Sequence, residues 1–171
     1  FVRYTALQTI NWAIYRLSYA KADKAVRRDV RRLLGWVYKN DKTKEGRRKA
    51  IDILGNDGGV IGFRGDAQDA RVLFKAATDA ERNVRSVALS ELRGCVKAGS
   101  AKCPLQPDQL RKWYGKETDK SLKQSIAALA GKLKMAKEVM DWCKSTVTDG
   151  SIYWGCRDAL KDVIAKENFE D

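Results

Sequence analysis

Histidine is absent from this chain of 171 residues. Its absence removes the commonest general base, the commonest metal ligand and the usual partner of a nucleophilic serine or cysteine. Catalysis would have to rest on carboxylates or lysine alone, so we expect no enzymatic activity, no metal ion and no cofactor. Long apolar runs are also absent. No stretch approaches the roughly 18 apolar residues of a membrane span, so we expect no segment to cross a membrane.

Zinc-type spacing is missing among the four cysteines, since no Cys-x-x-Cys is present. Cys95 and Cys103 are equidistant from one predicted turn, and Cys143 and Cys156 are equidistant from another. Residues placed in this way meet across the turn, so we expect two local disulfides. Disulfides indicate an oxidising, extracytoplasmic compartment, periplasmic or secreted. The alternative is buried free thiols, with which a cytoplasmic location stays open.

Acidic residues are scarce in one block of a chain whose net charge is +12. Residues 21–49 hold twelve Lys and Arg against four Asp and Glu. Such a block favours an anionic partner, which could be an acidic protein, a nucleic acid or a membrane surface. A solvated, solubilising face is the alternative. The candidate anion- or partner-binding residues form one predicted stripe opposite the apolar face of a helix: Lys24, Arg27, Arg28, Arg31 and Arg32.

One pattern recurs five times: a branched apolar residue, a basic residue, two variable positions, a small residue, an apolar residue, then Leu or Ile. The clearest copy is 84–92, and the copies start at residues 2, 46, 84, 122 and 152. These starts are 44, 38, 38 and 30 residues apart, as in helical-repeat proteins. Helix-type apolar spacing predicts nine helices and no strand. The helices are expected over 2–19, 24–39, a shorter range ending at 54, 66–78, 81–97, 107–116, 119–134, 137–146 and 151–166.

An acid precedes the basic residue of the pattern by six positions in three copies. The pairs are Asp41 with Arg47, Asp79 with Arg85, and Glu117 with Lys123. In these features the chain resembles the HEAT-repeat family, whose units place an Asp in the turn inside each helix pair and an Arg early in the second helix. The resemblance implies a structural ladder of ion pairs and capping bonds between neighbouring units. An acid suits the positive end of the second helix, and the base can reach its neighbour's acid.

The resemblance implies an all-α fold: a right-handed α-solenoid of about four to five HEAT-like helix pairs, or about nine helices, without a sheet. We expect one repeat domain over 1–171. Because Phe1 stands one residue before a copy of the pattern, the first unit would lack its leading helix, and the chain would be a fragment of a longer one.

Two further segments are secondary candidates for binding. The glycine-rich stretch 55–66 lacks the Lys-Ser/Thr pair of a phosphate-binding loop and is predicted to be a long connection. Two aromatic pairs, Trp36 with Tyr38 and Trp113 with Tyr114, lie next to basic residues, an arrangement similar to one that stacks nucleobases. For most of the tryptophans, however, packing between helices is the expected role.

The resemblance implies a non-enzymatic protein-interaction or scaffold module that binds a protein or peptide, in keeping with an extended solenoid surface. The alternative is a basic protein that binds nucleic-acid phosphates. A DNA glycosylase-like enzyme is the least expected function, because the nearest match to the catalytic Trp and Asp of HEAT-like glycosylases is Trp113 with Glu117, and Glu117 belongs to the ladder. The basic stripe belongs to the first helix of its pair, and in HEAT-like arrays the first helix lies on the outer, convex side. A stripe on that side would not line a concave surface that holds DNA, so an acidic protein or a membrane surface stays open as the partner.

Overall fold

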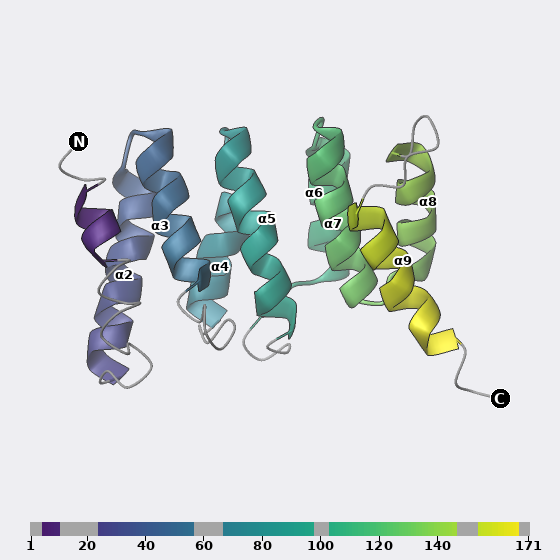
Figure 1. Cartoon of the computed structure of the whole chain (residues 1–171), viewed down its shortest axis with the longest axis horizontal. Coiled ribbons are helices and arrows are strands. Elements are labelled where there is room, and N and C mark those ends of the chain that lie inside the picture. Colours follow the sequence, from purple (N-terminus) through teal and green to yellow (C-terminus); the bar gives the residue numbers. More distant parts are fainter. Residues whose placement is uncertain (1–4, 11–23, 57–66, 98–102, 147–153, 168–171) are drawn as a thin grey trace. The chain divides into compact units, whose positions relative to one another are not determined.

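The computed structural model describes residues 5–10, 24–56, 67–97, 103–146 and 154–167, and every regular element within these ranges is helical (Figure 1). For this part of the chain the all-α prediction is confirmed. A short helical segment, 5–10, precedes α2. The other helices are α2 Lys24–Asn40, α3 Lys44–Asn56, α4 Ala67–Ala76, α5 Arg82–Lys97, α6 Pro107–Lys116, α7 Lys120–Lys132, α8 Ala136–Thr146 and α9 Trp154–Glu167. None of these helices is long and apolar enough to span a membrane.

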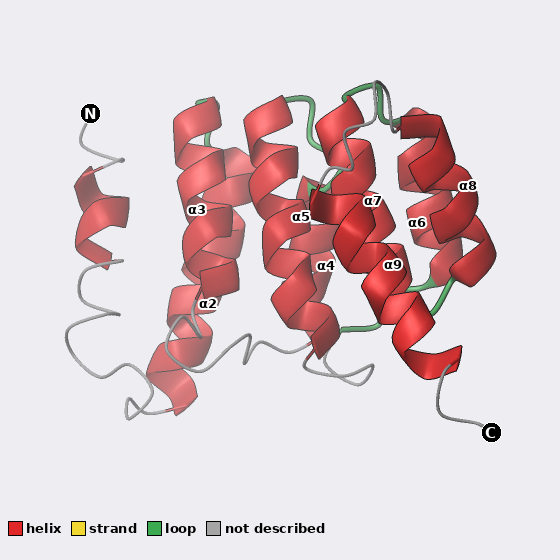
Figure 2. Ribbon diagram, turned by 45° about the vertical axis from the view of Figure 1, so that its right-hand side comes forward, coloured by secondary structure: helices red, strands yellow, loops and turns green. Residues whose placement is uncertain are grey.

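The chain divides into two compact units, Phe1–Pro104 and Leu105–Asp171, which we call unit 1 and unit 2. In unit 1, α3 packs beside α5, while α2 and α4 lie behind them as a second layer (Figure 2). In unit 2, α7 packs beside α9, and α6 and α8 form the other layer. Within the described residues, unit 1 thus contains the consecutive pairs α2–α3 and α4–α5 after the segment 5–10, and unit 2 contains the pairs α6–α7 and α8–α9. The expectation of a single repeat domain over the whole chain stays a prediction.

The core of unit 1 is formed by the apolar positions of the recurring sequence pattern. On α5, Val84, Ala88 and Leu92 follow one another at four-residue intervals and are fully buried. Residues at this spacing share one face of a helix. That face packs against α3, where Ile51 and Leu54 are buried. The pattern therefore specifies which side of each second helix enters the core.

Helix α7 is buried on nearly all sides, because α6, α8 and α9 all pack against it. Two glycines permit the close approach of α7 and α9. A Cβ atom at Gly131 would lie 2.7 Å from the Cα and the carbonyl oxygen of Ala159. A Cβ atom at Gly155 would lie 2.6 Å from the carbonyl oxygen of Gln124. Backbone atoms cannot swing aside as a flexible side chain can, so both positions require glycine.

Gly131→Ala is therefore expected to lower the free energy of unfolding by about 2 kcal/mol, since overpacking against backbone outweighs the better helix propensity of alanine. Gly115→Ala is the matched control, because a Cβ atom at Gly115 of α6 would meet nothing within 4 Å. The free energy of unfolding of this control should rise by about 0.5 kcal/mol. Urea unfolding of the two variants measures both effects, and equal midpoints would contradict the close approach of α7 and α9.

The helix boundaries follow local signals. Pro107 is the first residue of α6, where its missing N–H has no intrahelical partner to lose. The Asp119 side chain accepts a hydrogen bond from the Leu122 N–H and caps α7. Asp79 accepts from the Glu81 N–H, two residues on, just ahead of α5. Parts of two predicted helices lie outside the described residues. These are 2–4 and 11–19 of the helix predicted over 2–19, and 151–153 of the helix predicted over 151–166.

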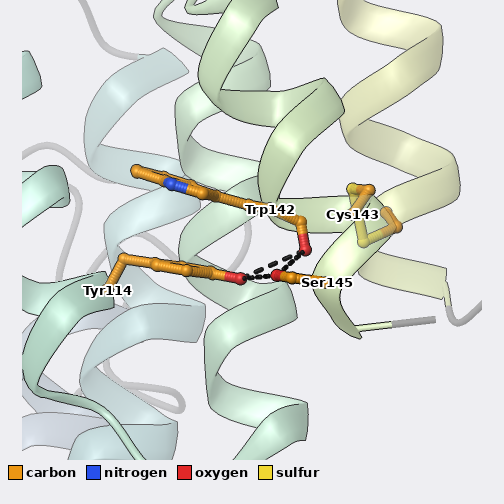
Figure 3. Close-up of a disulfide and its surroundings, with 5 residues drawn as sticks. Tyr114, Trp142, Cys143 and Ser145 are labelled. Atoms are coloured by element: carbon orange, nitrogen blue, oxygen red, sulfur yellow. Dashed lines mark hydrogen bonds between the residues drawn. A yellow bond between two sulfur atoms is a disulfide. The ribbon is translucent and has the colours of Figure 1, made fainter. Parts of the chain in front are cut away.

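The cysteines are paired locally, in the connectivity that the sequence favours. Cys95 pairs with Cys103 at a Cα–Cα distance of 5.3 Å, and Cys143 pairs with Cys156 at 5.6 Å. The second pair joins α8 to α9 (Figure 3).

Next to this disulfide, the rings of Tyr114 and Trp142 stack with their centroids 4.2 Å apart (Figure 3). The Tyr114 hydroxyl donates to the carbonyl oxygen of Trp142 and lies 2.7 Å from the Ser145 hydroxyl. Aromatic stacking and hydrogen bonding therefore hold α6 against α8 on one side, while the disulfide holds α8 to α9 on the other.

Candidate functional site

The cations of α2 divide into two rows rather than forming the single stripe that the sequence predicts. Arg28 and Arg32 are exposed, with 61% and 67% of their side chains accessible, and both lie within 4.0 Å of the exposed Asp29 carboxylate between them. Arg27 and Arg31 are half-buried. Residues four apart lie on one helical row, so one row faces solvent while the other turns toward the neighbouring helix. Lys24 begins α2, and its side chain lies outside the described residues.

Arg31 is directed at α4, where its Nε lies 3.4 Å from the Asp69 Oδ2. The two side chains are only 17% and 10% exposed. Asp69 is a buried acid that the sequence analysis did not single out, because an acid in the first turn of a helix is ordinarily exposed and serves the helix end. The pair removes Arg31 from the residues available to a partner and fixes α2 against α4.

The exposed row of α2 ends in an aromatic residue. Trp36 follows Arg32 by four residues, as Arg32 follows Arg28, and 63% of Trp36 is exposed. For Trp36 the expected packing role is wrong, whereas Trp113 is buried as expected. We call Arg28, Arg32 and Trp36 the α2 row. Tryptophan and arginine are the residue types most enriched among energetically dominant contacts of protein interfaces.

A cavity of about 430 Å³ opens between α2 and α4 beside the α2 row. Its walls bring four cations, one acid, one aromatic ring and two small or apolar positions together. The lining residues are Arg28, Arg31, Arg32, Gly35, Trp36, Lys39, Asp69 and Val72. Because Asp69 is paired with Arg31, the remaining lining charge is positive. The α2–α4 cavity is the candidate functional site.

The ladder residues meet one another as structural contacts. The Arg47 guanidinium donates through Nε and Nη2 to the two carboxylate oxygens of Asp79, each at 3.2 Å. Arg47 also donates to the carbonyl oxygens of Asp41 and Lys42, and Arg85 makes the same pair of backbone contacts in its own turn. The bidentate bond joins the second helix of one pair to the turn of the next.

Asp79 gathers partners from three segments of unit 1. Besides Arg47 and the Glu81 N–H, it accepts a hydrogen bond from Tyr38 of α2. Burial alone would raise the pKa of Asp79, but the bonds from Arg47 and Glu81 outweigh it and the pKa is lowered. Burial and the nearby Asp79 raise the pKa of Tyr38 to about 12. Asp79 is thus ionised and fully engaged in structure at neutral pH.

The other ladder positions are also occupied by local contacts. Asp41 accepts from the Thr43 N–H and hydroxyl, and Glu117 accepts from the N–H groups of Thr118 and Asp119. The Lys123 ammonium lies 5.0 Å from the centroid of the Tyr114 ring, a cation–π distance.

Glu117 therefore serves the start of α7, and its neighbour Trp113 is buried. The nearest match to a glycosylase-type pair is engaged in packing and capping.

Glu91 of α5 is a perturbed acid that sequence reasoning missed. Burial and, second, the nearby Asp52 carboxylate raise its pKa to about 7. Its side chain packs directly over Gly55 of α3. A Glu in the middle of a charged helix gives no sign of burial, since burial depends on what packs opposite. Within the described ranges, no group of three or more Cys, Asp or Glu is arranged to hold a metal ion.

The raised pKa of Glu91 makes stability depend on pH. Between its ordinary pKa of 4.5 and about 7 the native state binds more protons than the unfolded chain, so stability falls as pH rises through this window. Glu91→Gln, which mimics the protonated acid, should raise the free energy of unfolding by about 1 kcal/mol near pH 8, allowing for solvent screening, and leave it unchanged near pH 4.5. Urea unfolding at the two pH values measures this. Glu45→Gln, at an exposed position of α3, is the control, and an equal gain in both variants would refute the assignment.

Comparison with known proteins identifies no relative of this chain. No family model matches the chain, and neither curated proteins nor solved structures give a significant match. The glycine-rich stretch proposed from sequence as a secondary binding segment lies outside the described residues over 57–66. Among the residues that the structure does describe, the α2–α4 cavity combines exposed cations with an exposed tryptophan, and function is inferred from this geometry.

Proposed function

We propose that the chain is a non-enzymatic protein-interaction module built on HEAT-like helix pairs, and that it binds an acidic protein partner through α2. The observation that carries the proposal is the α2 row, in which two exposed arginines lead to an exposed tryptophan beside a basic cavity. The bidentate Arg47–Asp79 bond and the two-layer helix pairs support the HEAT-like solenoid. The paired cysteines support an oxidising, extracytoplasmic compartment.

An acidic protein fits the α2 row better than a nucleic acid does. Arg28, Arg32 and Lys39 are the exposed cations among the residues that line the cavity, and the exposed Asp29 offsets part of the charge of the two arginines, whereas Arg31 is bound to Asp69. A protein that binds the nucleic-acid backbone strongly can neutralise about 6 to 10 phosphates, a longer series than these side chains supply. A short charged row that ends in tryptophan is typical of a protein contact, where a few aromatic and arginine residues supply most of the affinity.

Charge reversal tests the proposal. The variant Arg28→Glu/Arg32→Glu is compared with Lys112→Glu/Lys116→Glu, which reverses two exposed cations at the same four-residue spacing on α6. The probe is fluorescently labelled polyglutamate at low salt, with a single-stranded DNA of equal charge as the competing polyanion. We expect the α2 variant to lose about tenfold in polyglutamate affinity and the α6 variant to lose little.

Three results would reject the proposal: no binding of polyglutamate at low salt, equal losses in the two variants, or a preference for the DNA that depends on the α2 row. Because both variants change net charge equally, a uniform electrostatic effect lowers both affinities alike and is separated from a contact at α2. Circular dichroism checks that both variants stay helical, as expected for substitutions at exposed positions.

A further inference from the structure

The α2–α4 cavity has an apolar side as well as a charged one. The Trp36 ring stands at its edge, and Val72 of α4 lines it together with Gly35 of α2. A Cβ atom at Gly35 would lie 3.6 Å from the Val72 Cγ2, in ordinary contact, so a longer side chain at this position would occupy cavity space. Glycine inside a helix costs about 1 kcal/mol relative to alanine. A glycine here therefore keeps open a volume that a better helix former would reduce.

The volume and the charges select the class of ligand. About 430 Å³ lies within the range of ligand pockets and can hold a large side chain. A bare phosphate would leave the apolar wall formed by Trp36 and Val72 unused. An apolar side chain would instead cover Trp36 and Val72, while acids on one side of it along the peptide would lie near the exposed cations Arg32 and Arg28.

The spacing along α2 sets the order of these groups in the ligand. Arg32 and Trp36 are one helical turn apart, about 6 Å along the axis at 1.5 Å per residue. In an extended peptide this distance corresponds to about two residues, because each residue spans about 3.3 Å and alternate side chains face the same way. Arg28 lies one further turn along the row. In a peptide that runs parallel to α2, acid, any residue, acid, any residue, then an apolar residue is the order that matches the three positions.

We infer that the α2–α4 cavity is an anchor pocket for an extended acidic peptide segment, in which an aromatic or large aliphatic side chain enters beside Trp36 and alternate carboxylates pair with Arg32 and Arg28. This inference rests on the proposed function and specifies the ligand. It assigns most of the sequence selectivity to Trp36, Gly35 and Val72 and most of the orientation to the two arginines.

The test uses two labelled peptides of identical composition in binding assays with the whole chain. One has the order Glu-x-Glu-x-Phe, and in the other the glutamates are contiguous and distant from the phenylalanine. The wild-type chain should bind the ordered peptide about tenfold more tightly. Trp36→Ala and Gly35→Met should each lose about tenfold for the ordered peptide, since one removes the anchor's ring contact and the other fills the space.

Two matched variants serve as controls. Trp154→Ala removes a tryptophan that is 71% exposed on α9, and Gly115→Met adds a methionine where a Cβ atom meets nothing within 4 Å. Neither should change the affinity. Unfolding midpoints of all four variants report whether each one folds. A loss in Gly35→Met that accompanied unfolding would leave Trp36→Ala, at an exposed position, to decide the matter.

The possible outcomes distinguish a failure of the anchor-pocket inference from a failure of the proposed function. Equal affinity for the two peptides, with Trp36→Ala harmless but Arg28→Glu/Arg32→Glu damaging, would overturn the anchor pocket and retain an acidic partner at α2. Failure of both peptides to bind at low salt would overturn the proposed function itself. Tighter binding of single-stranded DNA than of the ordered peptide, lost in Trp36→Ala, would reassign the pocket to a nucleobase and overturn both.

Discussion

Replacing Asp79 with alanine is expected to lower the free energy of unfolding by about 3 kcal/mol. The Asp79 side chain is only 9% exposed and accepts two hydrogen bonds from the Arg47 guanidinium, which is 19% exposed. Removal of one partner from a nearly buried ion pair typically costs about 3 to 5 kcal/mol, because the other charge stays buried without compensation. Tyr38 and the Glu81 N–H lose an acceptor as well. We expect a loss at the lower end of this range because Arg47 keeps its hydrogen bonds to the carbonyl oxygens of Asp41 and Lys42.

Asp108→Ala is the matched control, since it removes the same side chain from an ion pair on the surface. Asp108 lies 2.6 Å from the Arg111 Nη1, but 90% of its side chain is exposed. Exposed pairs contribute about 0 to 1 kcal/mol, so this variant should unfold close to the wild type. Urea unfolding at neutral pH compares the two. Similar losses in both variants would show that the Arg47–Asp79 bond does not carry the stability assigned to it.

The lowered pKa of Asp79 gives the same prediction a pH dependence. A carboxyl group whose pKa is lower in the native state stabilises the fold above its ordinary pKa and loses that contribution as pH falls through the native pKa. The difference in stability between the wild type and Asp79→Ala should therefore shrink as the pH falls below about 4. A difference that stays constant to strongly acidic pH would mean that the ionised carboxylate is not what stabilises the native state.

Reduction of the two disulfides is the second large effect that we expect. In the chain-entropy account, closing loops of these lengths stabilises the fold by about 3 kcal/mol for Cys143–Cys156 and about 2.5 kcal/mol for Cys95–Cys103. Their sequence separations are 13 and 8 residues. Reductant should therefore lower the urea midpoint substantially, and Cys143→Ser/Cys156→Ser should reproduce the larger part of the loss.

The cysteine state is checked by intact mass with and without reductant and by a thiol count on protein folded under oxidising conditions. The structure predicts no reactive thiol before reduction and four afterwards. Four thiols before reduction, together with a urea midpoint that reductant does not change, would show that the disulfides do not form. The argument for an extracytoplasmic compartment would then fail.

Local signals in the sequence account for most of the fold. The spacing of Val84, Ala88 and Leu92 predicts both the helix and its buried face, because helical periodicity is a property of consecutive residues. Pro107 and Asp119 mark helix starts for equally local reasons. The symmetric placement of the cysteines about predicted turns likewise favours the observed pairing.

The candidate site depended on contacts that no local pattern encodes. The sequence shows that Arg27, Arg28, Arg31 and Arg32 lie away from the apolar face of α2, but not which of them meets α4. Arg31 is the arginine that meets α4, because its ion-pair partner Asp69 is buried there. Trp36 is exposed for a similar reason, since its surroundings depend on how α2 and α4 pack. Glu91 acquires its raised pKa only because Gly55 and Asp52 of α3 lie opposite.

A charge-swap cycle tests most directly whether α2 binds an acidic segment. Arg32→Glu is combined with a peptide in which the glutamate assigned to Arg32 is replaced by lysine, and all four pairings are measured by fluorescence anisotropy at low salt. Each single change should weaken binding about tenfold, and the doubly changed pair should regain most of the lost affinity. Arg32 pairing would be contradicted if the losses were additive or if the doubly changed pair bound more weakly than either single change.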